Sequence, residues 1–211
     1  MMSAPSSPRS FAPGTSPFHA KGLVYSGARE YWEQIVPGGV VAVQDAVAST
    51  GDARLAKFVE GPFVAGGWYD ALPIVPLSAT AARLCHIPHS QLVRENAAWL
   101  ARRDLRGVYR VLLALSSVAV VASRLGNLSM RYFDFGRAET ERVGDHALES
   151  HRFGIPAPLA TWFIFAAEGF VPVALQLAGA KDVVVRHGHP RPDGMVSGTP
   201  AVHIQFDIQW S

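Results

Sequence analysis

The sequence contains little charge and almost no cysteine. Charged residues make up 17% of the 211 residues, whereas soluble domains usually carry about 25%. The single cysteine, Cys85, has no partner for an internal disulfide, which indicates a reducing compartment and a cytoplasmic protein. The formal net charge is only +2, so we expect no nucleic-acid partner, which would need a wide basic surface.

The chain also lacks the short motifs of common catalytic and nucleotide-binding sites. It has no Gly-x-Ser-x-Gly, no Gly-x-Gly-x-x-Gly and no phosphate-binding loop. Asp145-His146 resembles half of an acid/base pair, but Gly144-Asp145 is more typical of a hairpin turn. We find no catalytic constellation and expect a protein that is not an enzyme.

No histidine cluster has the spacing of a metal site. His86 and His89 are three residues apart, with no further ligand nearby. His187 and His189 would share one face of a strand, and His203 is a candidate third ligand across the sheet. Solvated histidines at strand ends are the simpler interpretation, so we expect no metal.

The first twenty residues are rich in serine and proline. They contain four prolines, five serines and one charged residue, Arg9. This composition lacks the apolar segment of a secretion signal and is typical of a flexible tail. We therefore expect a tail over residues 1–20 and a single domain over residues 21–211.

One run is apolar enough to resemble a membrane span. Between Phe153 and Ala180 the only charged residue before Lys181 is Glu168, and the length would suffice to cross a bilayer. Prolines and glycines interrupt the run, and no second span accompanies it. We therefore expect a buried core helix and no membrane span.

Helical periodicity dominates the first half of the chain, and period-two alternation appears in the second half. We expect helices over residues 21–36, 40–49, 78–85, 88–103, 105–115 and 118–126, with a loop over 61–76. We expect strands over 128–137, 139–152, 181–189 and 201–210, with a turn before or within the second of them. We also expect a helix over 157–178 and a loop over 190–200. The fold class is therefore α+β: a helical N-terminal half followed by a β-β-α-β-β antiparallel sheet unit.

The basic surplus is concentrated in one stretch. Residues 83–110 hold six arginines against Glu95 and Asp104. Arg102, Arg103 and Arg106 are thus candidates for a surface that binds an acidic protein partner. A solvated helix face is the alternative.

The pattern as a whole resembles the haem–nitric oxide/oxygen binding (H-NOX) domain, its vinyl-reductase-type and TRAPP-like relatives, and uncharacterised bacterial paralogous proteins of this layout. In H-NOX domains a Tyr-x-Ser-x-Arg motif holds the haem propionates. Here Ser150 and Arg152 match the motif, whereas Leu148 replaces its tyrosine. The proximal histidine of the family follows an Asn-Leu pair, and here Ser129 follows Asn127-Leu128. The resemblance therefore implies a relative that lacks the axial ligand, so haem is not expected as the cofactor.

The resemblance implies a sensor or regulatory module that binds a ligand. The ligand would be an apolar small molecule between helices and sheet, with a carboxylate near Ser150 and Arg152. The candidate ligand-binding residues are Ser150, Arg152, Trp68, Tyr69, Trp99, Tyr109, Ser129 and Met130. The alternatives are a protein-interaction adaptor whose aromatic residues fill the core, and a haem protein with a non-standard ligand.

Overall fold

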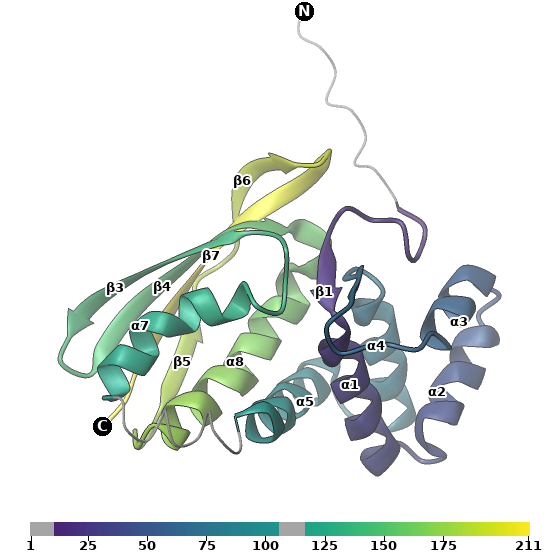
Figure 1. Cartoon of the computed structure of the whole chain (residues 1–211), viewed down its shortest axis with the longest axis horizontal. Coiled ribbons are helices and arrows are strands. Elements are labelled where there is room, and N and C mark those ends of the chain that lie inside the picture. Colours follow the sequence, from purple (N-terminus) through teal and green to yellow (C-terminus); the bar gives the residue numbers. More distant parts are fainter. Residues whose placement is uncertain (1–10, 106–116) are drawn as a thin grey trace, which may run out of the picture.

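The computed structural model describes residues 11–105 and 117–211, with the backbone alone for residues 125–129. Most of the helix expected over residues 105–115 lies outside these ranges. The described chain combines a helical N-terminal part with an antiparallel sheet that carries two further helices (Figure 1). This arrangement confirms the expected α+β class.

Helices make up most of the first part of the chain. Its elements are β1 (His19–Lys21), α1 (Gly22–Ile35), α2 (Gly39–Ala48), α3 (Ala53–Val59), β2 (Trp68–Asp70), α4 (Ile74–Leu84) and α5 (His89–Asp104). Four of these helices were expected, but α4 begins at Ile74 rather than at Ser78, and both its first turn and β2 lie in the stretch 61–76 that was expected to be a loop. The short helix α3 was not expected, although Asp52 caps it by accepting hydrogen bonds from the backbone N–H groups of Arg54 and Leu55.

The packed chain begins before Lys21, inside the stretch expected to be a flexible tail. Phe18 is 1% exposed, and β1 pairs with β2. The buried carboxylate of Asp70 accepts hydrogen bonds from the backbone N–H groups of Gly14 and Ser16. Composition could not show this, because a single buried aromatic side chain and one distant carboxylate fix the segment.

The second part contains the sheet. Its elements are α7 (Val118–Ser129), β3 (Arg137–Gly144), β4 (Ala147–Pro156), the 3₁₀ helix η1 (Ala157–Leu159), α8 (Ala160–Leu177), β5 (Val184–His187), β6 (Arg191–Val196) and β7 (Thr199–Gln209). The strand order is β3-β4-β7-β5, with β6 also paired to β7, and every pairing is antiparallel.

The strand expected over residues 128–137 is wrong. The helix α7 continues to Ser129, and a turn segment follows it before β3 begins. The alternation that suggested a strand comes from aromatic residues: Phe135 belongs to the core, and Tyr132 and Phe133 pack against it. Gly136, at φ +76°, allows the chain to turn into β3.

The loop expected over residues 190–200 is also wrong, because β6 forms there. Pro192 and Gly194 suggested a turn, but β6 pairs with β7 through a register shift between Pro192 and Met195. An irregular strand at the margin of a sheet tolerates such residues. The stretch 139–152, expected as one strand with a turn before or within it, forms the hairpin of β3 and β4. The described sheet therefore has five strands rather than the four expected.

The apolar helix α8 lies in the core. It is the one helix in the described ranges that is long and apolar enough to cross a membrane, and 56% of its apolar window is buried. It contacts α5, α7, β5 and β7. Packing against protein on several sides accounts for its composition.

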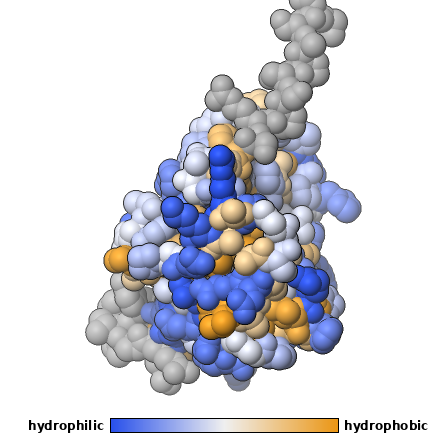
Figure 2. Space-filling view, turned by 90° about the vertical axis from the view of Figure 1, so that its right-hand side faces the viewer, coloured by the Kyte–Doolittle hydropathy of each residue, from blue (hydrophilic) through white to orange (hydrophobic). Residues whose placement is uncertain are grey.

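The face of the molecule shown in Figure 2 is mixed in hydropathy. Hydrophobic residues form small separate spots among hydrophilic ones. Exposed large apolar side chains such as Val41, Val64 and Trp68 occur singly along the sequence, and scattered residues of this kind are normal on a soluble domain.

Candidate functional site

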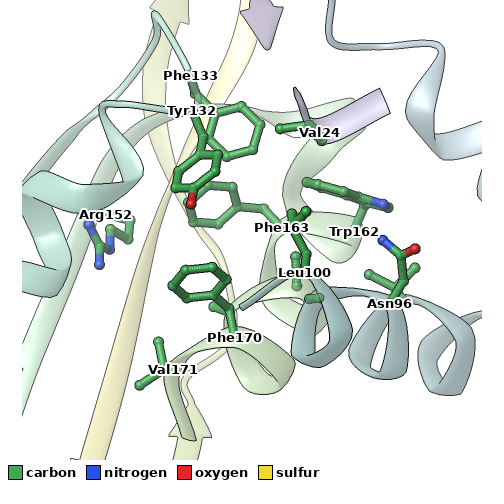
Figure 3. Close-up of a pocket in the computed structure, with 14 residues that line it drawn as sticks. Val24, Asn96, Leu100, Tyr132, Phe133, Arg152, Trp162, Phe163, Phe170 and Val171 are labelled. Atoms are coloured by element: carbon green, nitrogen blue, oxygen red, sulfur yellow. The ribbon is translucent and has the colours of Figure 1, made fainter. Parts of the chain in front are cut away.

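A partly open cavity lies where the helical part meets the sheet. Its volume is about 100 Å³. Helices α5 and α8, the turn after α7 and single residues of α1 and β4 form its wall (Figure 3). The lining residues are Val24, Val93, Asn96, Ala97, Leu100, Tyr132, Phe133, Arg152, Trp162, Phe163, Ala166, Ala167, Phe170 and Val171.

Two facing helices create this space through the sizes of their side chains. On α5, Val93, Ala97 and Leu100 recur at the spacing of one helical face. On α8, Ala166 and Ala167 leave room between the larger aromatic residues. These small side chains keep the cavity open, because longer ones would fill it.

A close helix crossing holds the cavity walls in place. A Cβ atom on Gly169 of α8 would lie 2.1 Å from the carbonyl oxygen of Arg94 on α5. Beside this contact, Arg94 Nε donates to Glu168 Oε2 at 2.6 Å. The glycine lets the two backbones touch, and the ion pair fixes their register.

The cavity is mostly aromatic. Tyr132 and Phe133 come from the turn after α7, while Trp162, Phe163 and Phe170 come from α8. The rings of Phe133 and Phe163 lie 5.8 Å apart, and those of Tyr132 and Phe170 lie 5.9 Å apart. Such a wall favours a flat apolar ligand, which can contact ring faces and edges.

Arg152 is the charged residue of the wall. On β4 it follows Leu148 and Ser150 on the buried face of the strand, and it is 6% exposed. Burial lowers the pKa of its guanidinium to about 10, so the group remains a cation at neutral pH. Figure 3 shows it at the edge of the aromatic cluster, on the side away from Asn96.

Asn96 is the polar residue on the opposite side of the cavity. It lies on α5 between Val93 and Leu100, and Figure 3 shows its amide oxygen on the side away from the aromatic cluster. Its Oδ1 atom is buried from the cavity space as well as from solvent, and it has no hydrogen-bond partner among the described residues. Most buried polar atoms in folded proteins are paired, so this oxygen is an exception.

The structure separates most of the residues that the sequence suggested for one pocket. Ser150 is buried beside Arg152 on β4, but its hydroxyl lies 3.3 Å from Thr140 Oγ1 rather than in the cavity wall. Tyr69 packs edge-on against Phe63, with ring centroids 5.0 Å apart. Trp68 is 45% exposed, under the ammonium group of Lys21.

The other candidates lie elsewhere or outside the described ranges. Trp99 packs against Tyr31, with ring centroids 6.0 Å apart. Met130 is 39% exposed, and the backbone of Ser129 ends α7. Tyr109 and Arg106 lie outside the described residues.

Arg102 and Arg103, the two described arginines of the candidate partner surface, differ in their contacts. Arg102 is exposed. Arg103 donates instead to Asp104 and Glu30, at 2.9 Å in each case. Within the described residues, the protein itself therefore neutralises one of the two charges.

Several lining residues escaped the sequence analysis. Asn96, Phe133 and Phe170 were not among its candidates. The helical phase of Val93, Ala97 and Leu100 could have indicated the cavity face of α5. Nothing local could show that this face opposes the aromatic residues of α8, because that contact joins segments far apart in the sequence.

The described residues do not form a metal centre. No group of three or more His, Cys, Asp or Glu side chains in these ranges could hold an ion. His203 lies 3.0 Å from His151, and His187 lies 3.6 Å from Glu168. His187 and His203, which the sequence suggested as ligands of one metal ion, thus contact different residues.

The cavity residues also do not fit a haem. Neither histidine nor cysteine occurs among the described lining residues. Tyr132 belongs to a residue type that can ligate haem iron, but its hydroxyl donates to Asp104 Oδ2 at 3.3 Å. A volume of about 100 Å³ is smaller than the roughly 150 Å³ cavity that holds one benzene molecule. A porphyrin needs far more space than benzene.

Comparison of the sequence with family models and with curated proteins gave no match.

Solved structures do match. A mutant structure of T. Tengcongensis H-NOX superimposes with a TM-score of 0.64 at 10% identity, covering 90% of this chain and 97% of that one. A Cs H-NOX mutant gives 0.63 at 11% identity, with coverages of 90% and 96%. An oxygen-binding H-NOX domain related to soluble guanylate cyclases gives 0.57 at 11% identity, with coverages of 90% and 92%. The chain therefore has the fold of H-NOX domains.

Proposed function

We propose that the protein is a non-catalytic ligand-binding or sensor module for a small, flat apolar molecule. The observation that carries this proposal is the aromatic cavity of about 100 Å³ between α5, α8 and the sheet. An oxygen-binding H-NOX domain, which binds a small molecule, has the same fold. That likeness supports the proposal but does not identify the ligand.

The size of the cavity limits the ligand to about one ring. A buried apolar cavity of about 150 Å³ binds benzene without any polar contact. Here the space is somewhat smaller but partly open, so we expect it to accept one ring that extends toward the opening. Burial of the ring supplies the binding free energy at about 25 cal/mol per Å² of apolar surface.

Arg152 gives one end of the cavity a preference for anions. A carboxylate at that edge would join the interactions that the guanidinium already makes, in surroundings of low polarity where charge-assisted hydrogen bonds are strong. The proposed ligand is therefore a small apolar molecule with a carboxylate at the edge near Arg152.

Two probe molecules distinguish the contribution of the apolar cavity to binding from that of the Arg152 charge. Benzoate carries a ring and a carboxylate, and toluene carries the ring alone. We expect both to bind, and we expect Arg152→Met to weaken benzoate about tenfold while leaving toluene nearly unchanged. Arg186→Met, on β5 and outside the cavity wall, is the matched control and should change neither. Isothermal titration calorimetry measures both affinities.

A cavity-filling variant tests whether binding occurs at this place. Ala166→Phe puts a ring where the probe would lie, so it should abolish binding of both probes. Its circular dichroism spectrum checks that it folds. Undiminished binding by Ala166→Phe would place the probes elsewhere, and no binding to the wild type would leave the adaptor hypothesis as the better one.

A further inference from the structure

We propose that the protein forms a weak homodimer in which the outer faces of two sheets pack against each other. The outer face is the side of the sheet that carries Glu139 of β3, His151 of β4 and Gln205 of β7, which lie in register with one another and form its middle row. These side chains are exposed or half-buried. Helices α7 and α8 pack on the opposite side, where Leu148 and Ile208 are buried. This inference goes beyond the proposed function and does not depend on the cavity.

One end of the outer face carries cations and stacked rings. The guanidinium of Arg137 lies 4.0 Å from the ring centroid of Phe153. The ring of His203 is parallel to that of Phe153 within 8°, with centroids 4.4 Å apart. Arg191 of β6 is the register partner of His203. We call these four side chains the cationic row.

Acidic side chains form a second row, four residues away along each strand. Glu141 is opposite Glu149 in the register of β3 and β4, and Glu149 is opposite Asp207 in the register of β4 and β7. Like charges directly opposite each other destabilise a sheet. Within the described residues, His151 Nε2 lies 3.6 Å from Glu149 Oε2, but no lysine or arginine forms an ion pair with this acidic row. A cationic surface would supply the missing countercharge.

A second copy of the chain brings such a surface to the acidic row. A twofold axis that runs across the strands through the middle row keeps each strand over the same strand of the other copy and exchanges the two end rows. Arg137 then faces Glu141 of the second copy, and His203 faces Asp207 of the second copy. Because a twofold interface uses the same surface on both copies, each of these pairs forms twice. The outer face is therefore complementary in charge to itself.

The shapes of the two rows also correspond. A hollow of about 160 Å³ lies beside the acidic row, with Glu149 and Asp207 in its wall and the exposed Val143 and Val184 at its margin. In the arrangement above, the ring of Phe153 comes over Glu149 of the second copy, next to this hollow. Burial of an aromatic ring adds apolar contact to the ion pairs.

Two contacts between like charges remain in this dimer. Glu139 lies near its own copy at the axis, but Arg137 of the same strand already forms an ion pair with it. Arg191 lies toward Arg186 of the second copy at the margin of the face, where both side chains are exposed and salt screens their repulsion. Neither contact outweighs the opposite charges elsewhere in the rows.

The dimensions of the outer face limit the strength of the dimer. Four strands about 4.8 Å apart, with about seven residues each, give a face of roughly 450 Å² per copy. The total of roughly 900 Å² is below the range of stable complexes and is typical of transient ones. We therefore expect a dissociation constant of about 100 µM.

Two charge reversals test this arrangement by sedimentation velocity. Arg137→Glu and Glu141→Lys each place like charges at both copies of one pair, so we expect each variant alone to dimerise at least about tenfold more weakly than the wild type. Mixed in equal amounts, the two variants should form a heterodimer as strong as the wild-type dimer. In the mixture the introduced acid faces the introduced lysine, and the unchanged Glu141 faces the unchanged Arg137.

Glu60→Lys is the matched control, because it reverses an exposed charge next to α3, away from the sheet. It should dimerise as the wild type does, and circular dichroism checks that all variants fold. A wild-type protein that stays monomeric at about 0.5 mM, five times the expected dissociation constant, would overturn the proposal and leave the acidic row to a basic partner of another kind. Reversals that dimerise as well as the wild type, or a mixture that stays monomeric, would also overturn it.

Discussion

The buried carboxylate of Asp70 shows how much one residue can organise. It is 4% exposed and accepts hydrogen bonds from the backbone N–H groups of Gly14, Ser16 and Leu72 and from the Ser16 hydroxyl. Two of these residues precede the first strand. The carboxylate therefore joins the start of the chain to the turn after β2.

Replacing this carboxylate should be costly. We expect Asp70→Ala to lower the free energy of unfolding by about 3 kcal/mol, because it leaves several buried donors unpaired. Asp52→Ala, which removes the cap of α3 at an exposed position, should cost only about 1 kcal/mol. Urea denaturation followed by circular dichroism measures both. Equal losses in the two variants would contradict the assigned role of Asp70.

Two histidines make stability depend on pH. Burial lowers the pKa of His89, and burial together with the charge of His151 lowers the pKa of His203, both from an ordinary value of 6.5. At pH values between these lowered pKa values and 6.5, the unfolded chain therefore binds more protons than the folded chain. The stabilisation is therefore complete above pH 6.5 and is lost as pH falls through the lowered pKa values.

We expect the free energy of unfolding to decrease from about pH 7 to pH 5. The variant His203→Gln should show a shallower decrease, because it lacks one of the two titrating groups. Urea titrations at several pH values test this expectation. A slope in His203→Gln as steep as in the wild type would contradict the contribution of His203.

At the scale of elements, the crossing of α5 and α8 sets the dimensions of the cavity. A Cβ at Gly169 would lie 2.1 Å from the backbone oxygen of Arg94. Backbone cannot move aside as a flexible side chain does, so the helices would have to separate. The apolar cavity walls would then move apart.

We expect Gly169→Ala to destabilise the protein by about 2 kcal/mol, because overpacking outweighs the better helix propensity of alanine. Gly66→Ala is the control, since a Cβ at Gly66 meets no atom within 4 Å, and it should be nearly neutral. Thermal denaturation compares the two. A Gly169→Ala variant as stable as the wild type would show that the crossing is not tight.

Local patterns predicted elements well where one signal dominated. The helices α1, α2 and α5 begin within a residue or two of their expected positions, and the alternation of Ile204, Phe206 and Ile208 correctly marked the buried face of β7. Prediction failed for residues 130–136 and for β6. In both places tertiary contacts determine the conformation of aromatic, proline or glycine residues, and a short window of sequence does not contain those contacts.

At the scale of the whole molecule, the sequence predicted one charged residue of the site but not its surroundings. The spacing of Ser150 and Arg152 could be compared with a family motif, whereas Asn96 and the aromatic residues of α8 meet only after folding. The aromatic residues Trp68, Tyr69 and Trp99 were plausible by composition alone. Composition does not distinguish a ring that lines a cavity from one that packs elsewhere.

Ligand binding should stabilise the entire fold. At a benzoate concentration 100 times its dissociation constant, we expect about 2.7 kcal/mol of added stability. For a chain of this size, that corresponds to a rise in melting temperature of roughly 5–10 °C. Scanning calorimetry measures the shift. Ala166→Phe should show none, and an equal shift in that variant would contradict binding in the cavity.

The most direct test of the central claim is the native mass of the protein isolated from its own cells, compared with its denatured mass. We expect an additional mass in the native spectrum that disappears on denaturation and matches a one-ring compound carrying a carboxylate. The same measurement on Ala166→Phe should give the bare chain. A native wild-type mass equal to the denatured mass would contradict the claim that this cavity holds a ligand.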